Sequence, residues 1–117
     1  MKRKIYISIP ISGERGGSEE VCKLKEQKAK EKADLLKAKL SREGYIVVSP
    51  FDVYCGKHPR YEDYICYDLR AMLDCDIVYF CEGWEHSLGC SVEHDVVMRF
   101  KSKVHDRNVK DYEIRYE

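Results

Sequence analysis

The chain has 117 residues, of which 44% are hydrophobic, so it can form one compact core and is too short for two ordinary domains. Basic and acidic residues number 21 each, and this balance gives no overall field to attract nucleic acid or an anionic membrane. No apolar stretch approaches the roughly 18 residues of a membrane span, and the N-terminus does not read as a leader. We therefore expect a single cytoplasmic domain over residues 1–117, in which any anion site is local.

Six cysteines and four histidines raise the question of disulfides or a metal site. The cysteines contain no Cys-x-x-Cys pair, and Cys75 and Cys81 border the most apolar segment. This pattern is typical of reduced, mostly buried thiols in a cytosolic protein. The histidines show no paired ligand spacing, so the sequence does not indicate a zinc site.

Hydrophobic periodicity predicts a repeated order of strand, loop and helix. Residues 3–9 alternate and are rich in β-branched side chains, which predicts a first strand, followed by a glycine-rich loop at 10–17. Apolar residues at steps of three, four and seven predict a long amphipathic helix over 18–43, ended by Gly44. Residues 45–51 predict the second strand.

The second half of the chain continues this order. Residues 61–74 predict a helix, and the continuous apolar run at 75–81 predicts a strand that is buried on both faces of a parallel sheet. Residues 109–117 supply a candidate last strand. Four apolar residues mark the third helix, namely Leu88, Val92, Val96 and Phe100.

This order predicts an α/β three-layer sandwich with a doubly wound, mainly parallel sheet of four to five strands, similar to flavodoxin or Rossmann folds. Ligands of such sheets bind at the carboxyl ends of the strands, which selects the loops at 10–17, 50–60 and 82–87. The first loop lacks the G-x-G-x-x-G spacing, and no Walker lysine follows it. Dinucleotide redox chemistry and P-loop chemistry are therefore disfavoured.

The segment "EGWEHSLGCSVEH", residues 82–94, contains the parts of an anion site. If a helix begins at Ser87, the serine hydroxyl and the free backbone N–H groups after it can bind an anion at the positive end of the helix dipole. Gly89 leaves room for a ligand, and Glu93 lies on the same helical face, roughly 9 Å along the axis from Ser87. This spacing suits a phosphorylated pentose. The alternative is that Ser87 only caps the helix and Glu93 faces solvent.

A second carboxylate, Asp68, is flanked by Tyr64 and Tyr67 on the preceding helix. Two carboxylates and a tyrosine hydroxyl around one pocket are the groups needed to break an N-glycosidic bond. One carboxylate attacks the anomeric carbon, and the other handles the proton of the departing base. The alternative is an exposed Asp68 that pairs with Arg70 or Lys57.

Three blocks of the chain together resemble the nucleoside 2-deoxyribosyltransferase superfamily: "KIYISIPISG", "YEDYICYDLRAMLDCDIVYF" and "GWEHSLGCSVEHDVVMRF". The "SLGCSVE" segment is especially similar to 2'-deoxynucleoside 5'-phosphate N-hydrolases, and the overall pattern also resembles their short uncharacterised bacterial and phage relatives. The resemblance spans residues 3 to about 101. It implies a doubly wound, five-stranded parallel sheet, and a homodimer or higher homo-oligomer in which a neighbouring subunit closes the pocket.

Carried over by position, the resemblance assigns Glu93 as the nucleophile, Asp68 as the acid/base and Tyr6 as the residue that orients Glu93. Ser87 matches the serine that contacts the phosphate. The transferases typically have aspartate at the position of Ser87, so serine favours a ligand with a 5'-phosphate over one with a 5'-hydroxyl.

The chain departs from the pattern of these relatives near both ends of the predicted ligand. Pro10 stands where the relatives have a small-residue turn, and proline has no backbone N–H for an anion. Ser12 and Gly13 are the candidate substitutes in phosphate binding. His94 and Asp95 follow Glu93 where relatives usually place an apolar residue and glycine.

The sequence thus predicts an N-glycosidase or deoxyribosyltransferase that acts on a 2'-deoxynucleoside or its 5'-monophosphate through a covalent glycosyl–Glu93 intermediate. The reaction needs no metal or organic cofactor, and the expected partner is a small-molecule nucleoside or nucleotide. Trp84 and Tyr64 are candidate contacts to the base, with a hydrophobic plug as the alternative for Trp84. The competing hypothesis is a catalytically inactive nucleotide-binding or sensor module. A third possibility is that the tyrosine-rich segment 54–67 is an interaction surface.

Overall fold

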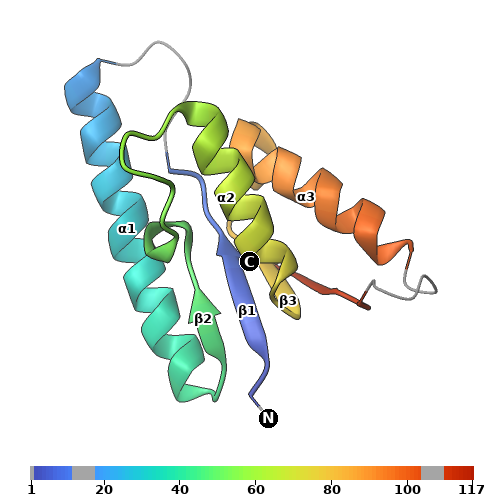
Figure 1. Ribbon diagram of the computed structural model, residues 1–117. Coiled ribbons are helices and arrows are strands. Elements are labelled where there is room, and N and C mark those ends of the chain that lie inside the picture. The colour runs from blue at the N-terminus through green and yellow to red at the C-terminus, as the bar shows by residue number, and fades with distance from the viewer. Residues whose placement is uncertain (1, 12–17, 104–109) are drawn as a thin grey trace.

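The computed structural model describes residues 2–11, 18–103 and 110–117 (Figure 1). Its described strands form one sheet in the order β2-β1-β3-β4, and all three pairings are parallel. In chain order the elements are β1 (Lys4–Ser8), α1 (Glu19–Arg42), β2 (Ile46–Val48), the 3-10 turn η1 (Pro50–Asp52), α2 (Tyr61–Leu73), β3 (Ile77–Phe80), the 3-10 turn η2 (Trp84–His86), α3 (Leu88–Lys101) and β4 (Glu113–Tyr116).

The predicted α/β architecture is confirmed. The sheet has four strands in the described part of the chain, the lower number of the prediction, and one fewer than the resemblance implied. The second strand is shorter than predicted because Pro50 opens a 3-10 turn that diverts the chain. None of the helices in the described ranges is long and apolar enough to cross a membrane.

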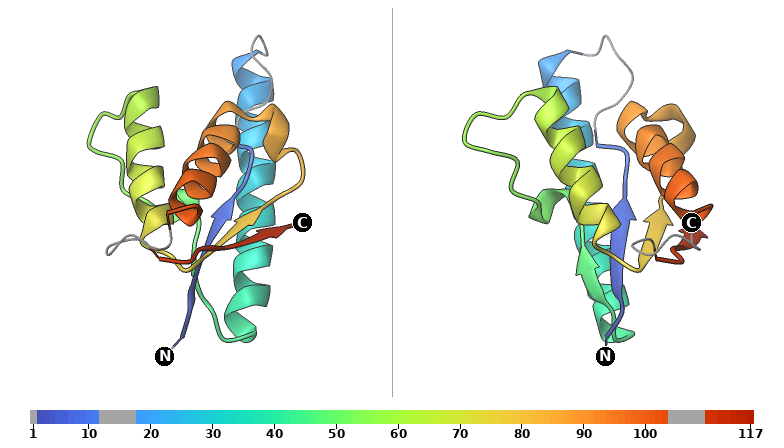
Figure 2. Two further views of the ribbon diagram at one scale, coloured as in Figure 1. Left: turned by 90° about the vertical axis from the view of Figure 1, so that its right-hand side faces the viewer. Right: turned by 45° about the vertical axis from the view of Figure 1, so that its right-hand side comes forward.

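The sheet is the middle of three layers, with α1 on one face and α2 and α3 on the other (Figure 2). Alternation along β1 produces this arrangement, because successive side chains of a strand point to opposite faces. Ile5 and Ile7 face α1 and pack with Ala33. Tyr6 faces the other way, into the cluster that contains Met72 of α2 and Val97 of α3. The predicted three-layer sandwich follows from this two-sided burial.

The long first helix also forms as predicted. Ser18 caps its N-terminus and accepts a hydrogen bond from the backbone N–H of Val21. Gly44 follows the helix with a φ of 98°, a conformation that favours glycine. Ala29, Ala33 and Leu40 form its buried stripe, whereas its many charged residues face outward.

The third helix forms over the predicted segment, and its buried face centres on Glu93. The buried residues of α3 are Cys90, Glu93 and Val97, whereas Leu88 is 49% exposed and Phe100 is 40% exposed. The buried residues therefore lie on a different face of the helix from the four apolar residues that mark it in the sequence. A carboxylate, which polarity alone would assign to the outside, occupies the centre of the buried face. The helix therefore turns Glu93 toward the sheet.

The path of the chain creates a switch point between β1 and β3. The connection from β1 through α1 leads to β2 on one side, and the connection through α2 crosses back to β3 on the other side of β1. Ser8 and Phe80 are paired at the carboxyl ends of the two strands. The loops that follow them diverge at this point, and ligands of doubly wound sheets bind there.

Candidate functional site

The carboxylate of Glu93 is buried between α3, which carries it, and β1 of the sheet, and only 6% of the residue is exposed. The Tyr6 hydroxyl donates a hydrogen bond of 2.6 Å to Oε2 of Glu93, and the Ser8 hydroxyl donates one of 2.8 Å to Oε1. Both donors lie on β1, two residues apart and hence on the same face of the sheet. Each carboxylate oxygen thus has one hydroxyl donor, which fixes the orientation of the group.

The local structure of α3 sets the position of Glu93. The helix begins after Ser87, as predicted, and the Ser87 hydroxyl accepts a hydrogen bond of 3.3 Å from the backbone N–H of Cys90. Cys90, Glu93 and Val97 recur at three and four residues and form the buried stripe. The predicted alternative of a solvent-facing Glu93 is therefore wrong.

Asp68 is the second carboxylate of the site. It lies on α2 and is half-buried, and its Oδ1 atom is buried without a hydrogen-bond partner. It forms no ion pair with Arg70 or Lys57, so the alternative of an exposed, paired aspartate is wrong. Because buried polar atoms are rarely left without a partner, this oxygen is a group of the site that remains available for a hydrogen bond.

Burial changes the pKa of both carboxyl groups. Desolvation raises the pKa of Asp68 to about 6. Desolvation also raises the pKa of Glu93 to about 7, although the hydrogen bonds from Tyr6 and Ser8 oppose this rise. The charge of Asp68 raises the pKa of Glu93 further. The same two carboxylates and burial raise the pKa of Tyr6 well above 10, so its hydroxyl remains a donor.

Ser8 and Cys90 are site residues that the sequence analysis missed. Ser8 follows Tyr6 by two positions in an otherwise apolar strand, and this alternation was the available signal. The Cys90 thiol interacts with the hydroxyls of Ser8 and Ser87, and burial raises its pKa to about 11. Cys90 therefore joins the first turn of α3 to the site of Glu93, as a neutral thiol.

The remaining predicted residues occupy several places. Gly89 lies in the first turn of α3, and a β-carbon there would meet nothing within 4 Å, so core contacts do not require glycine. Tyr64 is 48% exposed and lies one helical turn before Asp68. Ser12 and Gly13 lie outside the described residues.

Trp84 belongs to an aromatic cluster that includes His94 of α3. Its ring stacks on His94 with 4.1 Å between ring centroids and an interplanar angle of 22°. Phe80 and Tyr116 are its further ring neighbours, at 5.4 Å and 5.9 Å. Because His94 covers one face of the indole ring, this arrangement fits the predicted alternative of a hydrophobic plug.

Within the described ranges, no group of three histidine, cysteine, aspartate or glutamate side chains is placed to hold a metal ion. Four cysteines are buried thiols, namely Cys55, Cys75, Cys81 and Cys90. The side chains gathered around Glu93 are carboxyl and hydroxyl groups, which can carry out nucleophilic attack, proton transfer and hydrogen bonding.

One family model, described as a domain of unknown function (DUF4406), matches residues 3–106. Comparisons with curated proteins and with solved structures gave no match. The matched range runs from β1 to the end of α3 and so includes Tyr6, Asp68 and Glu93. The chain therefore belongs to the DUF4406 family.

Proposed function

We propose that the protein cleaves or transfers at the N-glycosidic bond of a 2'-deoxynucleoside or its 5'-monophosphate. The observation that supports this function is the pairing of Glu93, which two hydroxyls orient, with Asp68, whose buried oxygen has no partner. A retaining glycosidic reaction needs one carboxylate as nucleophile and one carboxyl group as acid. The two groups come from facing helices at the switch point of the sheet.

In the first step, an oxygen of ionised Glu93 attacks the anomeric carbon of the deoxyribose. The bond from this carbon to the base breaks, its electron pair stays with the base, and Asp68 supplies the proton that neutralises the leaving nitrogen or a conjugated ring atom. In the second step, ionised Asp68 takes a proton from water or from a second base. That acceptor attacks the same carbon and releases Glu93.

Tyr6 and Ser8 serve this chemistry by holding Glu93 in one position. Each hydroxyl occupies one site on a carboxylate oxygen, and the remaining lone pairs stay available for attack. The two hydrogen bonds also lower the pKa of Glu93 and so favour its ionised, nucleophilic form. Burial provides the low-dielectric surroundings in which this balance operates.

Ser87 is the proposed contact for the 5' end of the ligand. Its oxygen already accepts the backbone N–H of Cys90, which leaves the hydroxyl proton free to donate to a phosphate oxygen. A serine carries no charge that would repel phosphate. The first backbone N–H groups of α3 provide further donors beside it.

The test is release of free base from purified protein incubated with the four deoxynucleosides and their 5'-monophosphates, measured by liquid chromatography. The isosteric substitution Glu93→Gln should abolish release. Glu85→Gln, which changes an exposed carboxylate of η2, is the matched control and should retain it. Equal release by wild type and Glu93→Gln would contradict the assignment.

The second candidate function is a nucleotide-binding or sensor module without catalysis. The pKa of Glu93 near 7 favours it, because a protonated carboxyl group cannot attack. Pro10, which supplies no N–H for a phosphate, points the same way. Binding of deoxynucleoside monophosphates in calorimetry, without release of base at any pH between about 5 and 9, would establish this function in place of the first.

We propose further that the protein acts in the cytoplasm as a homodimer or higher homo-oligomer. The four buried thiols of Cys55, Cys75, Cys81 and Cys90 support a reducing compartment. Exposed apolar residues beside the site support a subunit contact, namely Tyr61, Tyr64, Tyr67 and Leu88. Light scattering after size-exclusion chromatography measures the mass directly, and a monomer at micromolar concentration would contradict the oligomer.

A further inference from the structure

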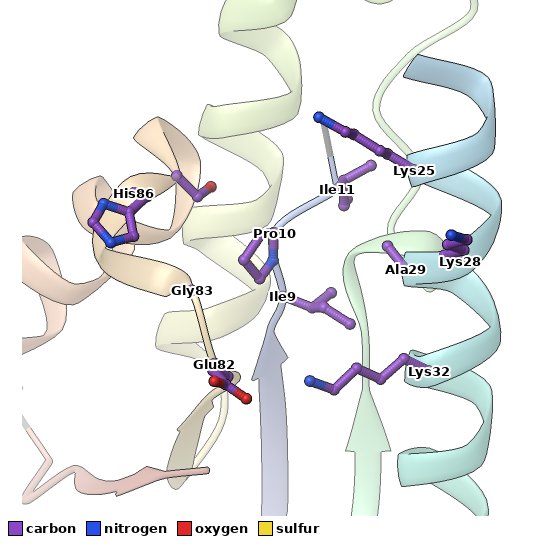
Figure 3. A pocket seen from close by; sticks show the side chains of 11 residues that line it. Ile9, Pro10, Ile11, Lys25, Lys28, Ala29, Lys32, Glu82, Gly83 and His86 are labelled. Atoms are coloured by element: carbon purple, nitrogen blue, oxygen red, sulfur yellow. The ribbon is translucent and has the colours of Figure 1, made fainter. Parts of the chain in front are cut away.

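A cavity of about 410 Å³ opens between α1 and the loops that follow β1 and β3. Figure 3 shows Lys25 and Lys32 extending from α1 toward the end of β1, with His86 and Glu82 on the opposite side. Lys28 completes the row of lysines on the helix. The floor is apolar and is formed by Ile9, Ile11 and Ala29.

The lysine row is only partly balanced by acidic groups. Lys32 pairs with Glu117 at 2.6 Å, whereas Lys25 and Lys28 form no ion pair with any other described residue. Glu82 is the acidic side chain among the residues that line the cavity. Like charges three and four residues apart destabilise a helix by a few tenths of a kcal/mol per pair, so this row carries a cost that an alternating pattern would avoid.

The cavity is continuous with the proposed 5' end of the ligand because Ser87 lines it as well. Ser87 also caps α3, whose buried stripe carries Glu93. A nucleotide with its sugar at Glu93 and its first phosphate at Ser87 would therefore direct any additional phosphate groups past Gly83, toward the lysine row. Gly83 has a φ of 89°, and a β-carbon there would lie 3.7 Å from the ring of Pro10.

We propose that this cavity binds the outer phosphate groups of a deoxynucleoside 5'-di- or triphosphate, so that the substrate class of the Glu93 site is the polyphosphorylated nucleotide. This inference rests on the proposed function of the Glu93 site. Each further phosphate adds negative charge within reach of flexible lysine side chains. The apolar floor strengthens the attraction because it excludes water on one side.

The inference also gives a role to the loop that follows β1. Pro10 supplies no N–H to a phosphate, so the chain loses a donor where the first phosphate is expected. The lysine row offers compensation through charge on the neighbouring helix, at positions that do not depend on the backbone of this loop. The attraction of the protein for the ligand then comes mainly from contacts to the outer phosphates and less from contacts to the first phosphate.

The experiment is calorimetric titration of Glu93→Gln protein, which binds without turnover, with the mono-, di- and triphosphate of one deoxynucleoside and with tripolyphosphate alone. Affinity should rise by about tenfold or more from the mono- to the triphosphate at low salt. The added substitutions Lys25→Gln and Lys28→Gln should remove this rise. The control pair, Lys23→Gln and Lys30→Gln, changes two exposed lysines of α1 that do not line the cavity and should preserve it.

Equal affinity for the mono- and triphosphate would overturn the inference, as would a rise that survives Lys25→Gln and Lys28→Gln. Tripolyphosphate that binds as tightly as the nucleotide would also overturn it, because free polyphosphate would then be the ligand. Base release by the wild type separates this inference from the proposed function. If the wild type releases base from monophosphates but the protein shows no preference for polyphosphates, the proposed function stands and the inference about the cavity fails. If the protein prefers polyphosphates but releases base from no nucleotide, the cavity binds the outer phosphates and the proposed catalysis fails.

Discussion

The Tyr6 hydroxyl donates a hydrogen bond of 2.6 Å to the carboxylate of Glu93, which lies 87 positions further along the chain. The bond joins the central strand to the helix that follows β3, in the interior of the molecule. A bond that served only stability would contribute little, because the carboxylate must lose its hydrating water to form it and this desolvation is unfavourable. Its geometry fits the nucleophilic role proposed for Glu93, and its removal has predictable consequences.

Tyr6→Phe keeps the ring in the core and removes only the hydroxyl. Base release should fall by about tenfold to hundredfold in kcat/KM, since hydrogen bonds to charged groups contribute about 1.5 to 3 kcal/mol. The pKa of Glu93 should rise because the bond from Tyr6 lowers it. The high-pH limb of the rate profile should therefore move to higher pH and the maximum rate should fall, because the higher pKa of the pair sets that limb. Tyr79→Phe, on β3 and packed against the α1 face of the sheet, is the control that should change neither quantity.

The dependence of kcat/KM on pH should be bell-shaped. The productive form has Glu93 ionised and Asp68 protonated, and the pair titrates with pKa values of about 7 and about 6. Activity should fall in acid because Glu93 gains a proton, and in base because Asp68 loses one. The maximum should lie between these two values, and rates measured from pH 5 to 9 test it.

Asp68→Asn provides the control for this profile. The substitution should remove the high-pH limb and leave one acid limb at the pKa of Glu93, which should lie below about 7 because the charge of Asp68 no longer raises it. A deoxyriboside with a p-nitrophenolate leaving group, which departs without a proton, should be used to retain measurable turnover. A profile that keeps both limbs in this variant would contradict the assigned role of Asp68.

Glu93→Gln should stabilise the fold at alkaline pH. The pKa of Glu93 is raised from 4.5 to about 7, so the native state binds the proton more tightly than the unfolded state. Stability from this group is therefore fully present below pH 4.5 and is lost as the pH rises to 7. The difference amounts to about 3 kcal/mol above that window.

Urea denaturation at pH 4.5 and pH 8 measures this effect. The unfolding free energy of Glu93→Gln should match that of the wild type at the lower pH and exceed it at the higher. The exposed control Glu85→Gln should follow the wild type at both values. A Glu93→Gln protein that is less stable at pH 8 would mean that the carboxylate is a net stabilising group and not a strained functional one.

The sequence predicted the layers and the main carboxylates for a simple reason. The alternation in β1 and the periodicity of α1 are local patterns, and the sheet enforces both of them. The pattern of α3 left the burial of Glu93 as one of two alternatives, because polarity alone assigns a carboxylate to the surface. Ser8 was missed because its partner, Glu93, is remote in the sequence and becomes its neighbour only when α3 covers β1. Both cases concern the polar interior, where long-range contacts outweigh local preference.

Ser87→Asp tests which 5' group the site accepts. Aspartate is as good an N-cap as serine, so α3 and the position of Glu93 should persist. The added charge should repel a 5'-phosphate and can accept a hydrogen bond from a 5'-hydroxyl. The ratio of kcat/KM for a deoxynucleoside to that for its monophosphate should therefore rise by about tenfold or more. Ser87→Asn has the same shape and capping ability without the charge, so a similar rise in that variant would trace the effect to size and remove phosphate recognition from Ser87.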